Sequence, residues 1–137
     1  MIPKLPAPYA TFFLRIPLAA MFFQQGLSKF PVTEANAEVF GLPFIVWWFV
    51  AYGEVGSAIG LIVGGIVGIL FTSGIISELA DLLTRFSGIT MTCVVTGIIW
   101  LMMPTSLIDV ITRDYLHVSL YVGGLYFALR GNSKYGF

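Results

Sequence analysis

The sequence predicts an all-α integral membrane protein, a bundle of four transmembrane helices with short interfacial helices in its loops. The 137 residues are 58% hydrophobic and only 10% charged, with a mean hydropathy of +0.92, whereas soluble domains carry about 25% charged residues. Four apolar stretches approach the roughly 20 residues that a helix needs to cross a bilayer of about 30 Å. Apolar residues follow one another in these stretches without alternation, which favours helices over a membrane β-barrel.

The expected spans cover residues of about 8–28, 44–71, 86–103 and 115–130, within a single domain of residues 1–137. The first span contains Arg15 and Pro17, and the third ends before Pro104. The residues before the first span hold several prolines and no clear cleavage site. We therefore interpret them as a retained interfacial lead-in and not as a signal peptide.

Two of the connections are expected to form short amphipathic helices in the membrane interface. In residues 72–85 the apolar residues recur at helical spacing, and Asp81 and Arg85 are placed to pair across one helical turn. Residues 105–114 have a similar but shorter pattern, in which Ser106 and Asp109 approximate a capping box.

An even number of spans places both termini on one side of the membrane. The basic residues then divide unequally between the two sides, with Lys4, Arg85, Arg130 and Lys134 on the side of the termini and Lys29 and Arg113 on the other. The positive-inside bias predicts cytoplasmic termini. The expected location is the inner (cytoplasmic) membrane of a prokaryote.

Charge and motif content exclude several classes of function. The net charge is zero and the chain has no basic stripe, so nucleic acid is not an expected partner. Cys93 is the only cysteine and His117 the only histidine, so the sequence predicts neither a disulfide nor a metal site. Phosphate-binding loops, dinucleotide fingerprints and Ser-His-Asp sets are missing from the sequence. We do not expect the chain to catalyse a complete reaction alone.

Glu54 and Arg15 are the candidates for catalytic chemistry. Glu54 lies well inside the second span, at a depth where ionisable residues are costly, usually face the bundle interior and pair with another group. Arg15 lies inside the first span and is the expected partner if the two helices pack antiparallel. The carboxylate is then either half of a structural ion pair that fixes helix packing or a contact for a proton, a quinone or a substrate.

The second span also contains glycines at intervals of four residues, in the stretch YGEVGSAIGLIVGGIVG at residues 52–68. Small residues at this spacing let helix backbones approach closely in lipid. A helix-packing surface is therefore expected at Gly53, Gly56, Gly60, Gly64 and Gly68. The alternative is a groove that admits a flat ligand such as a quinone ring, a pigment tail or a lipid.

His117, at the start of the fourth span, is the one candidate cofactor ligand. A lone interfacial histidine is expected to hydrogen-bond a nearby loop, here close to Arg113 or Asp114. Axial ligation of a haem or a chlorophyll-type pigment is the alternative.

Several short motifs, taken in order from about Leu14 to the C-terminus, resemble the DoxX family of small four-helix membrane proteins. They are Leu14-Arg15, Gly26-Leu27-Ser28-Lys29-Phe30, Gly41-Leu42-Pro43, the Glu54 helix, Leu83-Thr84-Arg85 and Gly131-Asn132-Ser133-Lys134-Tyr135. The resemblance implies a membrane subunit of oxidoreductase assemblies, such as thiosulfate:quinone oxidoreductase or detoxification complexes with soluble redox enzymes. It also implies a family-type polar set of Arg15, Gly26, Lys29 and Glu54.

The leading expectation is an accessory or anchoring subunit of a larger redox or energy-transducing membrane complex, contributing to a quinone or lipid pocket. The first alternative is a quinone-reducing oxidoreductase subunit in which Glu54 handles protons, and the second is a small membrane transporter. The candidate cofactors are a quinone, a lipid, or a pigment or haem supplied by a partner chain. The expected partners are the lipid bilayer and other membrane subunits, in a homo- or hetero-oligomer.

Overall fold

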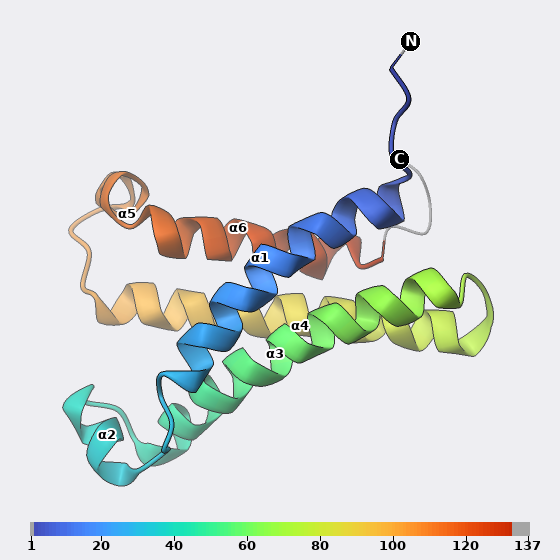
Figure 1. Cartoon of the computed structure of the whole chain (residues 1–137). Helices are drawn as coiled ribbons and strands as arrows, with labels where there is room; N and C mark the ends of the chain where they lie inside the picture. The colour runs from blue at the N-terminus through green and yellow to red at the C-terminus, as the bar shows by residue number, and fades with distance from the viewer. Residues whose placement is uncertain (1, 133–137) are drawn as a thin grey trace.

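The computed structural model describes residues 2–132, and these fold into α-helices without any strand (Figure 1). The helices are α1 (Ala7–Leu27), α2 (Glu34–Val39), α3 (Phe44–Leu70), α4 (Gly74–Leu101), α5 (Leu107–Arg113) and α6 (Tyr115–Arg130). The predicted all-helical class is confirmed. Among the described residues, α3 and α4 are the two helices that are long and apolar enough to cross a membrane.

The four long helices form a bundle in which α1 packs on α3, α3 on α4, and α4 on α6. The start of α1, the turn between α3 and α4, and the end of α6 lie at one end of the bundle (Figure 1). We refer to this as the termini end. The short helices α2 and α5 lie at the opposite end, where α3 and α4 diverge (Figure 1).

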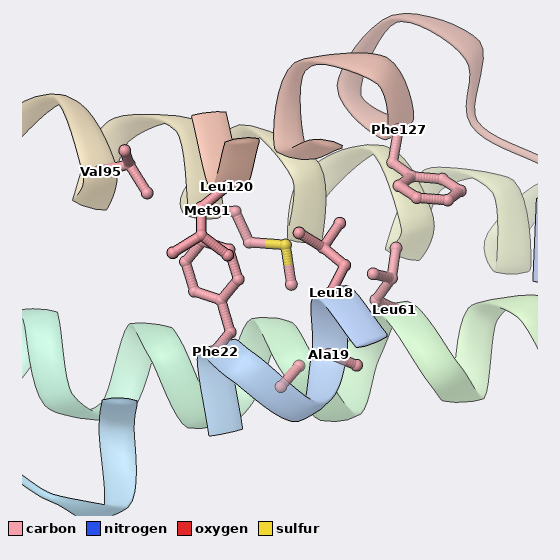
Figure 2. Packing of buried hydrophobic residues seen from close by; sticks show 9 residues of the cluster. Leu18, Ala19, Phe22, Leu61, Met91, Val95, Leu120 and Phe127 are labelled. Atoms are coloured by element: carbon pink, nitrogen blue, oxygen red, sulfur yellow. The ribbon is translucent and has the colours of Figure 1, made fainter. Parts of the chain in front are cut away.

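The core lies between the long helices and receives side chains from all four of them. Figure 2 shows Phe22 of α1, Leu61 of α3, Met91 of α4 and Leu120 of α6 pointing into the same space. The outward faces carry many large apolar side chains that no other part of the described chain covers, among them Phe13, Phe49, Phe86, Ile89 and Leu129. So many exposed large apolar side chains are unusual for a soluble monomer of this length.

Glycines set the close approach of the helices at two interfaces. A Cβ added at Gly64 would lie 3.0 Å from the carbonyl oxygen of Ala80 on α4, so α3 and α4 touch there through their backbones. A Cβ at Gly88 of α4 would lie 2.6 Å from the carbonyl oxygen of Gly124 on α6. Real Cβ atoms essentially never come within 3.0 Å of another heavy atom, so the approach of α4 to α6 requires glycine at position 88.

The prediction for residues 72–85 is wrong in one respect and confirmed in another. We expected a separate interfacial helix followed by a span starting near residue 86, but α4 runs without a break from Gly74 to Leu101. Its first half buries a stripe of small residues, Ser77, Ala80 and Thr84, which holds this segment inside the bundle. The expected pair of Asp81 and Arg85 does form, at 3.1 Å.

The other two short helices have side-chain caps at their N-termini. As expected, the Ser106 hydroxyl accepts a hydrogen bond from the Asp109 backbone N–H and so caps α5. Helix α2 lies in the connection of residues 31–43, for which the sequence had not predicted a helix. Its cap is the Thr33 side chain, which accepts a hydrogen bond from the backbone N–H of Asn36.

Candidate functional site

An ion pair between Lys29 and Glu54 lies between α1 and α3. The Lys29 Nζ is 2.7 Å from Glu54 Oε2, and the side chains are only 12% and 1% exposed. Lys29 Nζ also donates to the carbonyl oxygen of Gln25 at 3.0 Å. An ammonium group has three N–H donors, so these two bonds leave one donor for another acceptor.

Gly26 makes room for this pair. A Cβ at Gly26 would lie 3.1 Å from Glu54 Cβ and 3.0 Å from the backbone nitrogen of Val55. Any larger residue would therefore push the end of α1 away from α3, and with it the Lys29 ammonium. Gly26, Lys29 and Glu54 form one site, which we call the Lys29–Glu54 site.

Arg15 does not pair with Glu54, contrary to our expectation. Its Nη1 donates to the Leu61 carbonyl oxygen at 2.7 Å and to Thr84 Oγ1 at 3.0 Å, and its Nη2 donates to Asn132 Oδ1 at 2.6 Å. The guanidinium carbon also lies 4.8 Å from the centre of the Phe127 ring. Arg15 is thus the centre of a second buried site at the termini end.

The register of the two helices explains why the expected pair does not form. Arg15 faces Leu61 on α3, and Glu54 precedes Leu61 by seven residues, or about 10 Å at a rise of 1.5 Å per residue. The antiparallel packing that we expected places Glu54 opposite the end of α1, where Lys29 follows. A rotation about the helix axis alone could not bring Arg15 and Glu54 together.

An open cleft of about 1510 Å³ lies between α3 and α4 at the end where these helices diverge. Most of its wall is apolar and rich in aromatic side chains, including Phe40, Trp47, Tyr52, Phe86 and Trp100. Its polar wall residues include Lys29 and His117. Lys29 therefore takes part in the ion pair with Glu54 and is also one of the residues that line the cleft.

His117 has the loop contact that was expected. Its Nδ1 is 2.7 Å from Asp114 Oδ1, and the Asp114 side chain also caps α6. This contact fixes the imidazole and leaves its second ring nitrogen for another partner. Within residues 2–132, no cluster of three or more His, Cys, Asp or Glu side chains could hold a metal ion.

The glycines of α3 do not share one packing surface. Gly53, Gly60 and Gly64 face side chains of α4, whereas Gly68 faces Asn132 and Gly56 faces open space. Gly53 differs from the others because it also lines the cleft. The predicted close contact between helices therefore occurs at Gly60 and Gly64, and Gly56 takes no part in it.

Lys29 and Asn132 are the functional candidates that reasoning from the residues alone missed. Lys29 was selected only through the family resemblance, although a lone lysine one turn after the Gln24-Gln25 pair was a usable signal. Asn132 had no such signal, because its role depends on how the end of α6 folds back against α3 and α4. No family model, curated protein or solved structure matches the chain.

Proposed function

We propose that this chain is a four-span integral membrane protein whose cleft binds the ring of an isoprenoid quinone. Helices α3 and α4 meet the criteria for spans by length and composition. Helix α1 has 21 residues, or about 31 Å at 1.5 Å per residue, which matches a hydrocarbon core of about 30 Å. Helix α6 is shorter and packs along α4.

The distribution of charge inside the bundle supports a membrane location. Arg15 and Glu54, the two charged residues inside the helices α1 and α3, are 2% and 1% exposed. The faces turned outward carry large apolar side chains. Hydrocarbon tolerates this arrangement, because ionisable groups in membrane helices face the bundle interior and find partners there. The termini lie on the cytoplasmic side in this proposal, following the positive-inside bias.

The ligand assignment rests on Lys29, which both pairs with Glu54 and lines the cleft. Its charge is neutralised by Glu54 at 2.7 Å, yet its side chain lines an apolar cleft and keeps one N–H donor. A neutral site with a donor favours an uncharged ligand that accepts hydrogen bonds. Quinone carbonyl oxygens only accept hydrogen bonds, and the flat ring suits an aromatic wall.

An anionic lipid head group fits the same cleft less well. Its negative charge would have to compete with Glu54 for the single ammonium group, at a distance where like charges repel. The quinone tail can leave the cleft along the exposed apolar face of α4, past Phe86 and Ile89, into the bilayer. We therefore commit to a quinone and treat lipid binding as an outcome of the test.

The residues of the DoxX-like motifs support the same proposal by where they meet. Gly26, Lys29 and Glu54 come from separate motifs and gather at one site beside the cleft. Arg15 meets Asn132, which belongs to the last motif. Residues 133–135 of that motif lie outside the described part of the chain. We propose a DoxX-like accessory subunit that holds quinone for a redox complex, with electrons supplied by a partner subunit.

A pair of glycine variants on α3 tests quinone binding. Gly53→Phe places a ring in the cleft, where an added Cβ makes only ordinary contacts with Thr90 and Val94 at 3.4 and 3.7 Å. Gly56→Phe is the matched control, because nothing lies within 4 Å of its added Cβ and it does not line the cleft. Trp47 and Trp100 line the cleft, so a decrease in their fluorescence reports binding of a quinone, which quenches tryptophan fluorescence.

We expect a short-tailed, fully ring-substituted quinone to quench the wild-type protein saturably in lipid nanodiscs. Gly53→Phe should weaken this binding by about tenfold or more, equivalent to about 1.4 kcal/mol, while Gly56→Phe should bind like the wild type. Equal affinities of the two variants would refute the assignment of the cleft. Saturable binding of a phospholipid in place of the quinone would overturn the ligand class.

A further inference from the structure

Arg15 is a buried cation whose contacts among the described residues are all uncharged. The hydrogen bonds of its guanidinium go to a carbonyl, a hydroxyl and an amide oxygen, those of Leu61, Thr84 and Asn132. The carboxylate of Asp81 acts on this group electrostatically without a direct ion pair. Its oxygens are bonded to Arg85 at 3.1 Å and to the Asn132 backbone N–H at 2.7 Å. A buried charge without a paired counter-charge is costly, so an additional anion would stabilise this site.

A cavity of about 130 Å³ lies directly against Arg15, at the termini end. Its wall includes Thr11, Gly68, Ser77 and Asn132. Ser77 is 1% exposed, and its Oγ has no hydrogen-bond partner. The volume equals that of about four water molecules in the liquid, which is enough for a compact oxyanion and too small for a quinone ring with its tail.

The start of α4 adds positive potential to the same cavity. Ser77 and Thr72, which line it, stand at the N-terminus of this 28-residue helix. Its N-cap residue Ser73 makes no side-chain capping bond, and the first turn carries no acidic residue. No carboxylate in the first turn of α4 therefore offsets the positive end of its helix dipole.

We propose that this cavity binds a compact oxyanion of the phosphate type, held by the Arg15 guanidinium and the Ser77 hydroxyl. Arg15 supplies the charge, and Ser77 supplies the donor that now has no partner. The oxyanion is either a free ion or the phosphate of a lipid head group that enters from the membrane interface. The site is separate from the cleft, so the failure of either proposal leaves the other standing.

Thermal unfolding of the full chain in phosphate-free detergent tests the proposal. Inorganic phosphate should raise the Tm saturably relative to chloride at equal ionic strength, because a ligand that binds only the folded state stabilises it. If phosphatidic acid in nanodiscs raises the Tm and inorganic phosphate does not, the source is a lipid. If neither raises it relative to chloride or phosphatidylcholine, the cavity holds water only and the proposal is wrong.

Substitutions at Ser77 test whether phosphate raises the Tm by binding in this cavity. Ser77→Asp places a carboxylate beside Arg15, so we expect a higher Tm without phosphate and no further response to it. Ser73→Asp is the control, because Ser73 is exposed and outside the cavity wall, yet an acidic residue there also complements the helix dipole. It should keep the full phosphate response.

Ser77→Ala keeps the test valid if the aspartate variant does not fold. The wild-type hydroxyl makes no hydrogen bond, so its removal costs the fold little. We expect Ser77→Ala to weaken the apparent affinity for phosphate severalfold. A phosphate response of Ser77→Ala equal to that of Ser73→Asp would overturn the assignment of Ser77.

Discussion

Replacing Lys29 with methionine should destabilise the protein by about 3–5 kcal/mol, because removing one partner of a buried ion pair leaves the other charge uncompensated. Glu54 is 1% exposed, and Lys29 is its salt-bridge partner within the described chain. Reversible unfolding in mixed detergent micelles, followed by far-UV circular dichroism, measures the change.

A double variant distinguishes charge from packing. Lys29→Met combined with Glu54→Leu removes both charges, so most of the lost stability should return. Arg113→Met is the control for removal of a cation, since that side chain is 82% exposed in its pair with Asp109 and should matter by less than about 1 kcal/mol. A double variant as unstable as Lys29→Met alone would contradict an electrostatic role for the pair.

Replacing Arg15 with methionine should cost about 2–4 kcal/mol and loosen the end of α6. Hydrogen bonds to charged groups contribute about 1.5–3 kcal/mol each, and Arg15 makes three that join α1 to α3, α4 and Asn132. Part of that loss is offset, because the variant no longer buries a charge. The same unfolding assay measures the net change in the free energy of unfolding.

Hydrogen exchange tests where the Arg15 effect falls. Amides near the end of α6 should exchange faster in Arg15→Met, because Asn132 loses its partner there. Asn132→Ala should reproduce this local change while leaving Arg15 bonded to Leu61 and Thr84. Faster exchange spread evenly over all helices, with no excess at α6, would argue against a local anchoring role.

The sequence was sufficient to predict the helical class and the position of most long helices, because continuous apolar runs identify them. It was not sufficient for α4, since the polar residues of its first half indicate a surface helix until their partners are known. Asp81 is one example: its pair with Arg85 follows from their spacing, but its bond with the Asn132 backbone N–H does not. Tertiary contacts, and not local pattern, decide where this helix begins.

The candidate site was predicted in part. Ionisable residues inside apolar runs are conspicuous, so Glu54 and Arg15 were found. Their partners depend on the register between α1 and α3, which is set by the close contact at Gly26 and by where each helix ends. The cleft depends on the divergence of α3 and α4 and on α2, so no local sequence feature predicts it.

The two buried polar sites lie toward opposite ends of the bundle. The Lys29–Glu54 site joins α1 to α3 beside the open cleft. The site around Arg15 joins all four long helices beside a small cavity. A single central ion pair of Arg15 with Glu54 would have indicated one polar contact that fixes the packing of α1 on α3. Two separate sites allow one to hold a neutral ligand while the other holds an anion.

The proposal that the cleft opens into the membrane is tested most directly by measuring the depth of Cys93 in a bilayer. Cys93 is the only cysteine of the chain, is exposed, and lines the cleft. A nitroxide attached in detergent, followed by reconstitution into liposomes, reports collisions with oxygen, which concentrates in hydrocarbon, and with a neutral nickel chelate, which stays in water. A label at Thr105→Cys in a Cys93→Ala background calibrates the water-exposed case, since Thr105 lies in an exposed loop. We expect oxygen collisions to dominate at Cys93; nickel collisions as frequent as those at Thr105→Cys would contradict a cleft that opens into the membrane.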